Sequence, residues 1–228
     1  MTVVNDLSHL ALTELDPSDY AVPTIAPIRT TGDLDPVFCI HPLVGLVDCY
    51  AGLAAHVDDD RPIYGVQVPA SGERAESLAA LAAQYADDIV RIQTDGTVHL
   101  LGMSFGGVLA HAIAVELQNR GVTVGALTLL DSDPVRARAE GADLLGAMGD
   151  EIDRSHVEEL LAVASHNDEL VQRHLPGIYF GNVLAVSSLG TDSGSAWHPF
   201  VCGTVAKYLV PDATSFDVVG PLVDSYLG

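Results

Sequence analysis

Short apolar runs alternate with longer segments of helical period along most of the chain. Near-continuous apolar runs predict buried strands at residues 37–40, 63–68, 98–102, 124–130, 183–188 and 204–210. Apolar positions at helical spacing predict helices at residues 44–56, 75–91, 108–117 and 218–227. Strands that are apolar on both faces and that alternate with helices are typical of a mostly parallel sheet flanked by helices. The pattern therefore predicts an α/β fold.

Two segments depart from this alternation. Residues 1–22 are polar and acidic without a period, which predicts a flexible leader or inter-domain linker ahead of one domain at residues 23–228. Residues 135–176 are charged and helical in pattern, with two or more helices and no strand signal. An all-helical insertion between two strands of a sheet predicts a lid.

Composition and charge limit the class of function. Hydrophobic residues make up 48% of the chain and charged residues 18%, so the chain is expected to fold rather than to be disordered. A net charge of −21 argues against binding to nucleic acid or to an anionic membrane. No apolar run is long enough to span a bilayer, and the first 20 residues lack the features of a signal peptide. We expect a cytoplasmic protein.

The cysteines and histidines predict no metal site. Cys39, Cys49 and Cys202 are odd in number and lack a CxxC spacing, which favours free thiols in a reducing compartment. No His and Asp residues stand at the spacing of metal ligands. The glycines around Ser104 do not fit the dinucleotide-binding pattern. We therefore expect neither a metal nor a dinucleotide cofactor.

The residues GMSFGG at 102–107 form a G-x-S-x-G motif between a predicted strand and a predicted helix. In this motif the serine acts as a nucleophile, which requires it to stand on a sharp turn with its hydroxyl exposed. Gly102 and Gly106 remove the Cβ atoms that would collide in such a turn. The helix N-terminus then places backbone N–H groups beside the negative charge that develops on the substrate oxygen. Ser104 is therefore the predicted nucleophile.

Asp131 is the predicted acid partner of this serine. It follows the strand at residues 124–130, and a carboxylate at that end of a parallel strand can face the same crevice as the nucleophile. The order of Ser before Asp fits the order of the hydrolase triad. A capping role before Pro134 is the alternative for Asp131, although Asp133 could fill it. Asp192, after the strand at residues 183–188, is a second candidate acid.

The loop after the first predicted strand reads HPLVG at residues 41–45. A loop in this place can supply one oxyanion N–H, and Leu43 is the predicted donor, together with the N–H of Phe105. His41 precedes the nucleophile in the sequence and lies on this loop. We therefore interpret His41 as structural rather than catalytic.

Five segments in order resemble the thioesterase domains that end nonribosomal peptide and polyketide assembly lines. They are PIR at 27–29 with the turn at Gly32 and VFCIHP at 37–42, GMSFGG at 102–107, LLDS at 129–132, PGIY at 176–179 with Gly181, and Trp197 with Pro199. The resemblance implies an α/β-hydrolase fold with a helical lid. It also implies an acyl or peptidyl thioester substrate on the phosphopantetheine arm of a carrier protein, with release by hydrolysis or cyclisation.

The chain departs from this family at the catalytic histidine. The family carries a His-x-Asp segment just after the last strand, and here Ser215-Phe216-Asp217 falls in its place. No histidine follows His198. Since a serine hydroxyl cannot act as a general base near neutral pH, Ser104 lacks its expected base, and turnover is predicted to be impaired.

Other histidines could substitute for this base. His198 would have to fold back over the crevice, and His156, His166 and His174 lie on the predicted lid, where solvated side chains are expected. Three interpretations of Ser215 remain open. It is an engineered exchange that traps an acyl-enzyme, a natural variant that uses another base, or a mark of a relative that only holds a carrier-bound chain.

The functional hypotheses follow from these interpretations. The leading one is a carrier-dependent serine thioesterase, and the alternatives are a free-standing editing thioesterase or esterase, and a non-catalytic domain that binds a carrier arm. Val44 stands where the family often has glycine, which predicts a tighter oxyanion loop or a smaller acyl pocket. No long exposed apolar helix stripe stands out, so we expect a monomeric domain.

Overall fold

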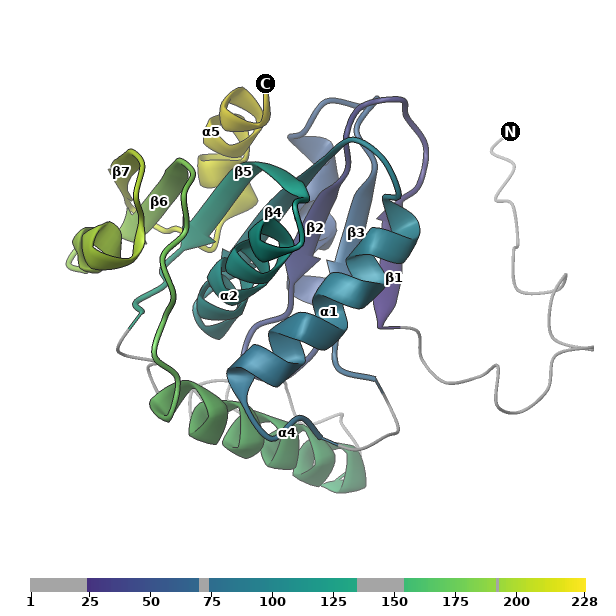
Figure 1. Ribbon diagram of the computed structural model, residues 1–228, viewed down its shortest axis with the longest axis vertical. Helices are drawn as coiled ribbons and strands as arrows, with labels where there is room; N and C mark the ends of the chain where they lie inside the picture. The colour runs from purple at the N-terminus through teal and green to yellow at the C-terminus, as the bar shows by residue number, and fades with distance from the viewer. Residues whose placement is uncertain (1–23, 70–73, 135–153, 192) are drawn as a thin grey trace, which may run out of the picture.

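The computed structural model describes residues 24–69, 74–134, 154–191 and 193–228. The predicted leader at residues 1–22 and the lid residues 135–153 lie outside the described residues. The elements follow in the order β1 (Ile25–Arg29), β2 (Val37–Ile40), η3 (Asp48–Ala55), β3 (Ile63–Val66), α1 (Leu78–Ile92), β4 (Thr97–Met103), α2 (Phe105–Asn119), β5 (Thr123–Leu130), α4 (Arg154–Gln172), β6 (Val183–Ser188), η4 (Gly194–Phe200), β7 (Val205–Val210) and α5 (Phe216–Leu227) (Figure 1). None of the described helices is long and apolar enough to cross a membrane.

The described strands form one sheet in the order β1-β3-β2-β4-β5-β6-β7. β1 runs antiparallel to β3, and every other neighbouring pair is parallel. The chain winds from β2 outward to β3 and then crosses back to β4, so the loops after β2 and β4 meet at the same edge of the sheet. Ligands of open α/β sheets bind at the point where the strand order reverses in this way, beyond the carboxyl ends of the strands. The predicted α/β fold is confirmed.

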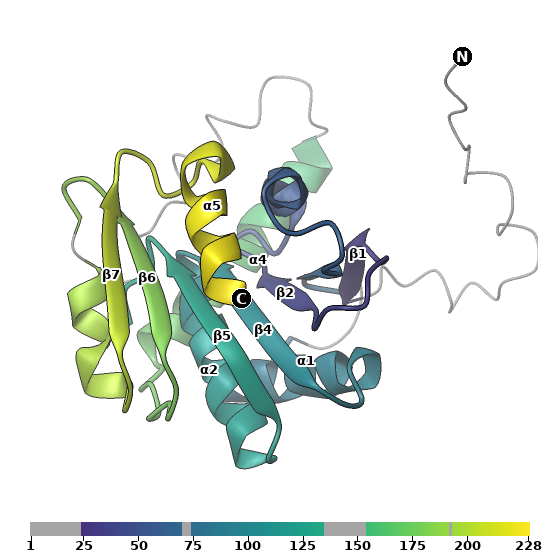
Figure 2. The ribbon, with the colours of Figure 1, turned by 90° about the horizontal axis from the view of Figure 1, so that it is seen from above.

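Helices cover both faces of this sheet. Viewed from above, α1 and α2 lie on one face, and η3 and α5 lie on the other (Figure 2). The helix α4 crosses near the ends of α1 and α2 (Figure 1), and its residues Ala164, Leu170 and Val171 belong to the same buried cluster as those two helices. The described part of the predicted lid therefore packs on the body of the domain.

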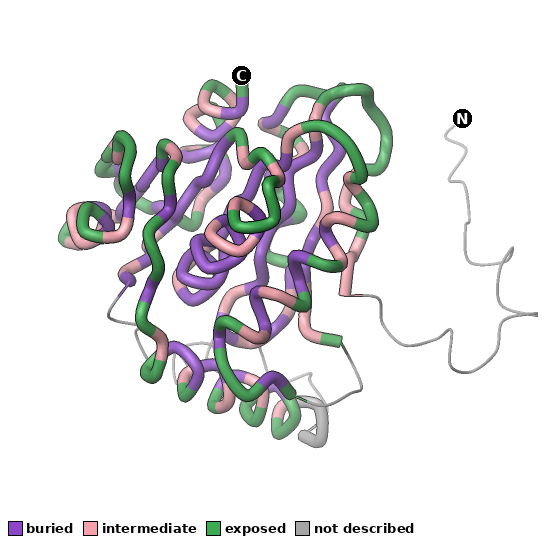
Figure 3. Tube along the Cα trace, in the orientation of Figure 1, coloured by how far each residue is buried: buried purple, intermediate pink, exposed green. Residues whose placement is uncertain are grey.

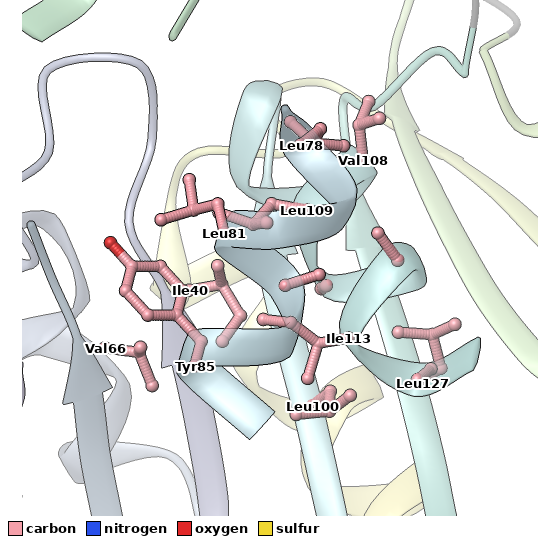
Figure 4. Packing of buried hydrophobic residues seen from close by; sticks show 14 of the residues in the cluster. Ile40, Val66, Leu78, Leu81, Tyr85, Leu100, Val108, Leu109, Ile113 and Leu127 are labelled. Carbon is pink, nitrogen blue, oxygen red and sulfur yellow. The ribbon is translucent and has the colours of Figure 1, made fainter. Parts of the chain in front are cut away.

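The core is divided by the sheet into two buried clusters. The larger one lies between the sheet and helices α1 and α2, where Tyr85 and Leu81 of α1 and Leu109 and Ile113 of α2 pack over Leu100 of β4 (Figure 4). The second lies between the sheet, η3 and α5. The central strands are buried along most of their length (Figure 3), which explains why their sequences are almost wholly apolar.

Several element predictions need correction. The strand predicted at 63–68 ends at Val66, and the helix predicted at 44–56 is the 3-10 helix η3 at Asp48–Ala55. α1 begins at Leu78 and not at residue 75, because the Ser77 side chain accepts a hydrogen bond from the Ala80 N–H and caps the helix. The strand β1 and the short helix η4 were not predicted. β1 contains Pro27, which cannot donate to a central ladder, and β1 is one of the two edge strands of the described sheet.

Candidate active site

Ser104 stands on a sharp turn between β4 and α2. Its backbone has φ 53° and ψ −120°, a conformation that a residue with a side chain rarely adopts. Its N–H donates to the Leu130 carbonyl at 2.8 Å, which ties the turn to the end of β5. The side chain of Ser104 makes no capping bond to α2. The hydroxyl is therefore not engaged by the helix that it precedes.

The glycines of the motif allow close contacts between backbone segments. A Cβ at Gly102 would lie 2.1 Å from the Gly106 carbonyl oxygen, and a Cβ at Gly106 would lie 2.4 Å from the Ile40 carbonyl oxygen. Such distances are far below van der Waals contact, so α2 can start directly at Phe105 only with glycine at both positions. This explains why the helix begins three residues before the predicted Val108.

Asp131 lies directly after β5 and is held by the neighbouring strand. Its carboxylate accepts hydrogen bonds from the Ser188 N–H at 2.7 Å, from the Ser188 hydroxyl at 2.5 Å and from the Thr191 hydroxyl at 3.3 Å. Its backbone has φ 43°. These partners at the end of β6 do not fit the alternative of a cap before Pro134. The second candidate acid, Asp192, lies outside the described residues.

A hydrogen-bond path joins Asp131 to the loop that carries Ser215. The Ser188 hydroxyl donates to Asp131 and accepts the Ala213 N–H at 3.0 Å. Ser215 follows two residues later and is the N-cap residue of α5, with a carbonyl that accepts from the Val218 and Val219 N–H groups. The structure thus brings the ends of β5 and β6 and the start of α5 to one edge of the sheet.

The loop after β2 is held by a buried network. The Pro42 carbonyl accepts hydrogen bonds from the Gly45 N–H at 3.0 Å and from Nδ1 of His41 at 2.7 Å. That carbonyl belongs to the same peptide unit as the N–H of Leu43, and in a trans peptide the two groups point in opposite directions. Fixing the carbonyl therefore fixes the direction of the Leu43 N–H.

His41 is wholly buried in this network. Its Nε2 lies 2.9 Å from the Tyr85 hydroxyl, and its ring stacks on Phe105 with centroids 5.7 Å apart. Burial lowers the pKa of His41 to about 4, against a smaller opposing effect of the Pro42 carbonyl. The neutral ring donates from Nδ1 and accepts the Tyr85 proton at Nε2. This environment fits the structural role expected of His41.

The other candidate bases have different surroundings. His166 donates from Nε2 to the Ala75 carbonyl at 3.0 Å, and His198 is exposed on η4. His174 is half-buried, and burial lowers its pKa. The side chain of His156 lies outside the described residues. No described histidine is hydrogen-bonded to Asp131, whose carboxylate meets Ser188 and Thr191 instead.

Sequence reasoning missed Tyr50, which joins the two loops of the candidate site. The hydroxyl of this buried residue donates to the Ile40 carbonyl at 2.7 Å and accepts the Met103 N–H at 3.0 Å. It therefore connects the last residue of β2 with the residue before Ser104. An aromatic residue in an apolar helix pattern is read as core, so no signal in the sequence distinguishes Tyr50.

No group of His, Cys, Asp or Glu within the described ranges could hold a metal ion. Ser104 sits at a helix N-terminus whose N–H groups and dipole favour a negative charge. The Leu43 loop approaches the same point, since Gly106 lies against the Ile40 and His41 carbonyls.

Comparison with known proteins places this geometry in a family. The thioesterase domain family matches residues 35–182. The dimodular nonribosomal peptide synthase of Bacillus subtilis (strain 168) is 44% identical over 124 residues, which are 53% of this chain and 5% of that protein. Malpinin synthetase of Mortierella alpina is 30% identical over 216 residues, which are 82% of this chain and 3% of that protein. The chain thus spans only a small part of the length of these relatives.

Solved thioesterase domains share the fold. The NocB thioesterase domain from the nocardicin cluster superposes with a TM-score of 0.70 at 24% identity, covering 86% of this chain and 91% of that one. The Vlm2 thioesterase domain gives a TM-score of 0.71 at 20% identity, covering 90% and 97%. With its mostly parallel sheet, which it shares with these solved domains, and the family match over most of its length, the chain belongs to the thioesterase domain family.

Proposed function

We propose that this chain is a serine thioesterase that takes an acyl or peptidyl chain from a phosphopantetheinyl carrier protein onto Ser104. The observation that carries the proposal is the strained backbone of Ser104 between β4 and α2, with φ 53°. Gly102 and Gly106, two residues away on either side, leave no room for a Cβ. Strained non-glycine residues cluster at functional sites. The family match supports the substrate class, since its relatives are peptide synthetases.

The geometry of the two loops supports the following acylation step. The Ser104 oxygen attacks the thioester carbonyl carbon, a C–O bond forms, and the carbonyl oxygen becomes an oxyanion. The N–H groups of Leu43 and Phe105 bind that oxyanion. The C–S bond then breaks, the carrier thiol leaves with the serine proton, and an ester on Ser104 remains. The phosphopantetheine arm belongs to the carrier, so the domain itself needs no cofactor for this step.

Release of the chain is the step in which Ser215 matters. Water or an internal nucleophile must attack the Ser104 ester, and a histidine base would activate it. Loss of such a base typically lowers turnover by about 10⁴- to 10⁶-fold. An ester is also a weaker electrophile than a thioester, so deacylation suffers more than acylation. We therefore expect the acyl-enzyme to accumulate.

A non-catalytic carrier-binding domain is the second candidate, and one observation favours it. Asp131 meets hydroxyl groups of Ser188 and Thr191 in place of a histidine. This candidate predicts that Ser104 is never acylated. A free-standing editing thioesterase or esterase, the alternative enzyme that the sequence suggests, predicts instead that small diffusible thioesters react as well as carrier-bound ones.

Intact-protein mass spectrometry after mixing with an acyl-loaded carrier protein tests the proposal. The expected result is an added acyl mass on the chain that is absent in Ser104→Ala. An acyl N-acetylcysteamine thioester, run in parallel, reports whether the carrier is needed. A chain that gains no mass and releases no acid would contradict the covalent mechanism and leave carrier binding as the function.

A further inference from the structure

The helix α4 presents an apolar face to the domain, and one polar residue interrupts this face. Leu160, Ala164, Leu170 and Val171 are buried at helical spacing. Asn167 lies in the same stripe and is only 2% exposed. A buried amide is unfavourable unless its hydrogen bonds are made. A single polar residue in an apolar seam also fixes the register of a packed helix.

The partner of Asn167 lies in the loop after β2. Its Nδ2 donates to the Leu43 carbonyl at 2.9 Å in a buried bond that joins residues 124 positions apart. One helical turn earlier, α4 packs on the same loop, since a Cβ at Gly45 would lie 2.9 Å from Cγ1 of Val163. The Gly45 carbonyl in turn accepts the Val68 N–H at 3.0 Å. The loop is therefore held between α4 and the segment after β3.

Two further bonds fasten α4 to the segment before α1. Arg74 donates from Nη1 to the Ala162 carbonyl at 2.9 Å, and His166 donates from Nε2 to the Ala75 carbonyl at 3.0 Å. These contacts hold α4 in place from the outside, near the ends of α1 and α2 where Figure 1 shows it. The hydrogen bond from Asn167 then ties the Leu43 loop to this fixed helix.

We infer that Asn167 of the lid helix is a positioning residue for the oxyanion-binding loop. The peptide unit before Leu43 is fixed through the Pro42 carbonyl by His41 and Gly45. The peptide unit after Leu43 is fixed by Asn167 through the Leu43 carbonyl. His41 and Gly45 set the direction of the Leu43 N–H, and Asn167 holds the peptide unit that follows. With the loop held on both sides of Leu43, rotation about φ and ψ of Leu43 is restrained and the N–H keeps that direction before substrate arrives. Oxyanion donors act by such preorganisation. The inference rests on the proposed acylation of Ser104.

The exchange of Asn167 for leucine tests this inference. Leucine keeps the size and fills the apolar stripe but cannot bind the Leu43 carbonyl. The limiting rate of Ser104 acylation at saturating loaded carrier is expected to fall about tenfold or more, with the half-saturating carrier concentration unchanged, because the oxyanion exists only in the transition state. Gln172→Leu is the matched control, an amide on the exposed side of the same helix, and is expected to react like the unaltered chain.

Hydrogen exchange of the folded variant gives a second, activity-independent measurement. The amides of Gly45 and Val68 are expected to exchange faster in Asn167→Leu and not in Gln172→Leu. If Asn167→Leu fails to fold, Asn167→Ala takes its place in both measurements. Unchanged acylation or unchanged exchange would overturn the inference, and so would a change in half-saturation alone, which indicates substrate binding instead. If the unaltered chain is never acylated, the proposed function fails, and the exchange result alone decides whether Asn167 fixes the loop.

Discussion

Ser104 and Asp131 both have a positive φ at the ends of adjacent strands. They are the two non-glycine residues with positive φ in the described part of the chain, at 53° and 43°. β4 and β5 are paired in parallel, and Met103 lies opposite Leu130, so the two residues follow partnered strand ends. Two strained residues side by side are expected where a fold holds reacting groups, since nothing in sheet or helix formation requires them.

The role of Asp131 should be visible only when a histidine is present. In Ser215→His, the new imidazole is expected to reach Asp131 along the path now occupied by Ser188 and Ala213, and deacylation of Ser104 should rise about 10²-fold or more. Asp131→Asn keeps the shape of the side chain, so it should leave the acylation rate of the unaltered chain nearly unchanged and abolish most of the gain in Ser215→His.

A double-mutant cycle of deacylation rates measures this coupling. Additive effects of the two exchanges would mean that Asp131 does not orient a base at position 215. In that case its hydrogen bonds to Ser188 and Thr191 would be its whole role, as a structural tie between β5 and β6.

At the scale of elements, the elbow depends on contacts between backbones. Gly106→Ala would place a methyl group 2.4 Å from the Ile40 carbonyl oxygen, so α2 or β2 must shift. We expect a loss of about 3 kcal/mol or more in the free energy of unfolding, measured by denaturant titration. Gly52→Ala is the control, since its Cβ would meet only Phe216 at 3.6 Å. It should be neutral or stabilise by up to about 1 kcal/mol. Equal effects of the two exchanges would contradict the elbow geometry.

Tyr50 is the element-scale link between β2 and β4. Tyr50→Phe keeps the ring in the core and leaves the Ile40 carbonyl and the Met103 N–H without their partner. The expected cost in unfolding free energy is about 1–3 kcal/mol. The exposed Tyr208→Phe on β7 should cost less than about 0.5 kcal/mol in the same titration. If Tyr50→Phe is as stable as Tyr208→Phe, the two hydrogen bonds of the Tyr50 hydroxyl do not stabilise the fold.

The sequence predicted those elements whose signal is local. β2, β4, β5 and β6 are buried apolar runs, and the glycine pattern identifies the β4–α2 turn. β1 was not predicted because Pro27 in its sequence argues against a strand, although proline is tolerated on an edge strand such as β1. η3 was predicted as an ordinary helix because helical spacing does not distinguish the 3-10 form.

The supporting contacts of the site could not be predicted in this way. Tyr50 reaches Met103 over 53 positions, Ser188 reaches Asp131 over 57, and Asn167 reaches Leu43 over 124. Local patterns carry no information about such pairs. The G-x-S-x-G motif indicated Ser104 and the carboxylate after a strand indicated Asp131. The hydrogen-bond partners around them become visible only when the sheet order is known.

At the scale of the whole molecule, acid should destabilise the fold through its buried histidines. His41, His99 and His111 are buried in the described part of the chain, and burial lowers the pKa of each to about 4 from 6.5. They are neutral in the folded state, so their contribution to stability is complete above pH 6.5. It is lost as the pH falls toward 4, because the unfolded chain then takes up protons that the folded chain excludes.

This linkage predicts a decline of up to about 4 kcal/mol per pH unit from the three groups together within that window. Denaturant titrations from pH 7.5 to pH 4.5 measure it. His111→Gln should lower the slope by about a third, because one of the three protons no longer distinguishes the two states. If the unfolding free energy of His111→Gln changes with pH as steeply as that of the unaltered chain, the buried histidine does not contribute to this dependence.

The proposed function requires that Ser104 forms an ester and that this chain releases it slowly, because Ser215 provides no base. The lifetime of the acyl mass on the chain, followed by intact-protein mass spectrometry after removal of the loaded carrier, tests it most directly. The account predicts a persistent adduct on the unaltered chain, a short-lived adduct with released product in Ser215→His, and none in Ser104→Ala. An adduct that decays equally fast in the unaltered chain and in Ser215→His would contradict it, because another group would then supply the base.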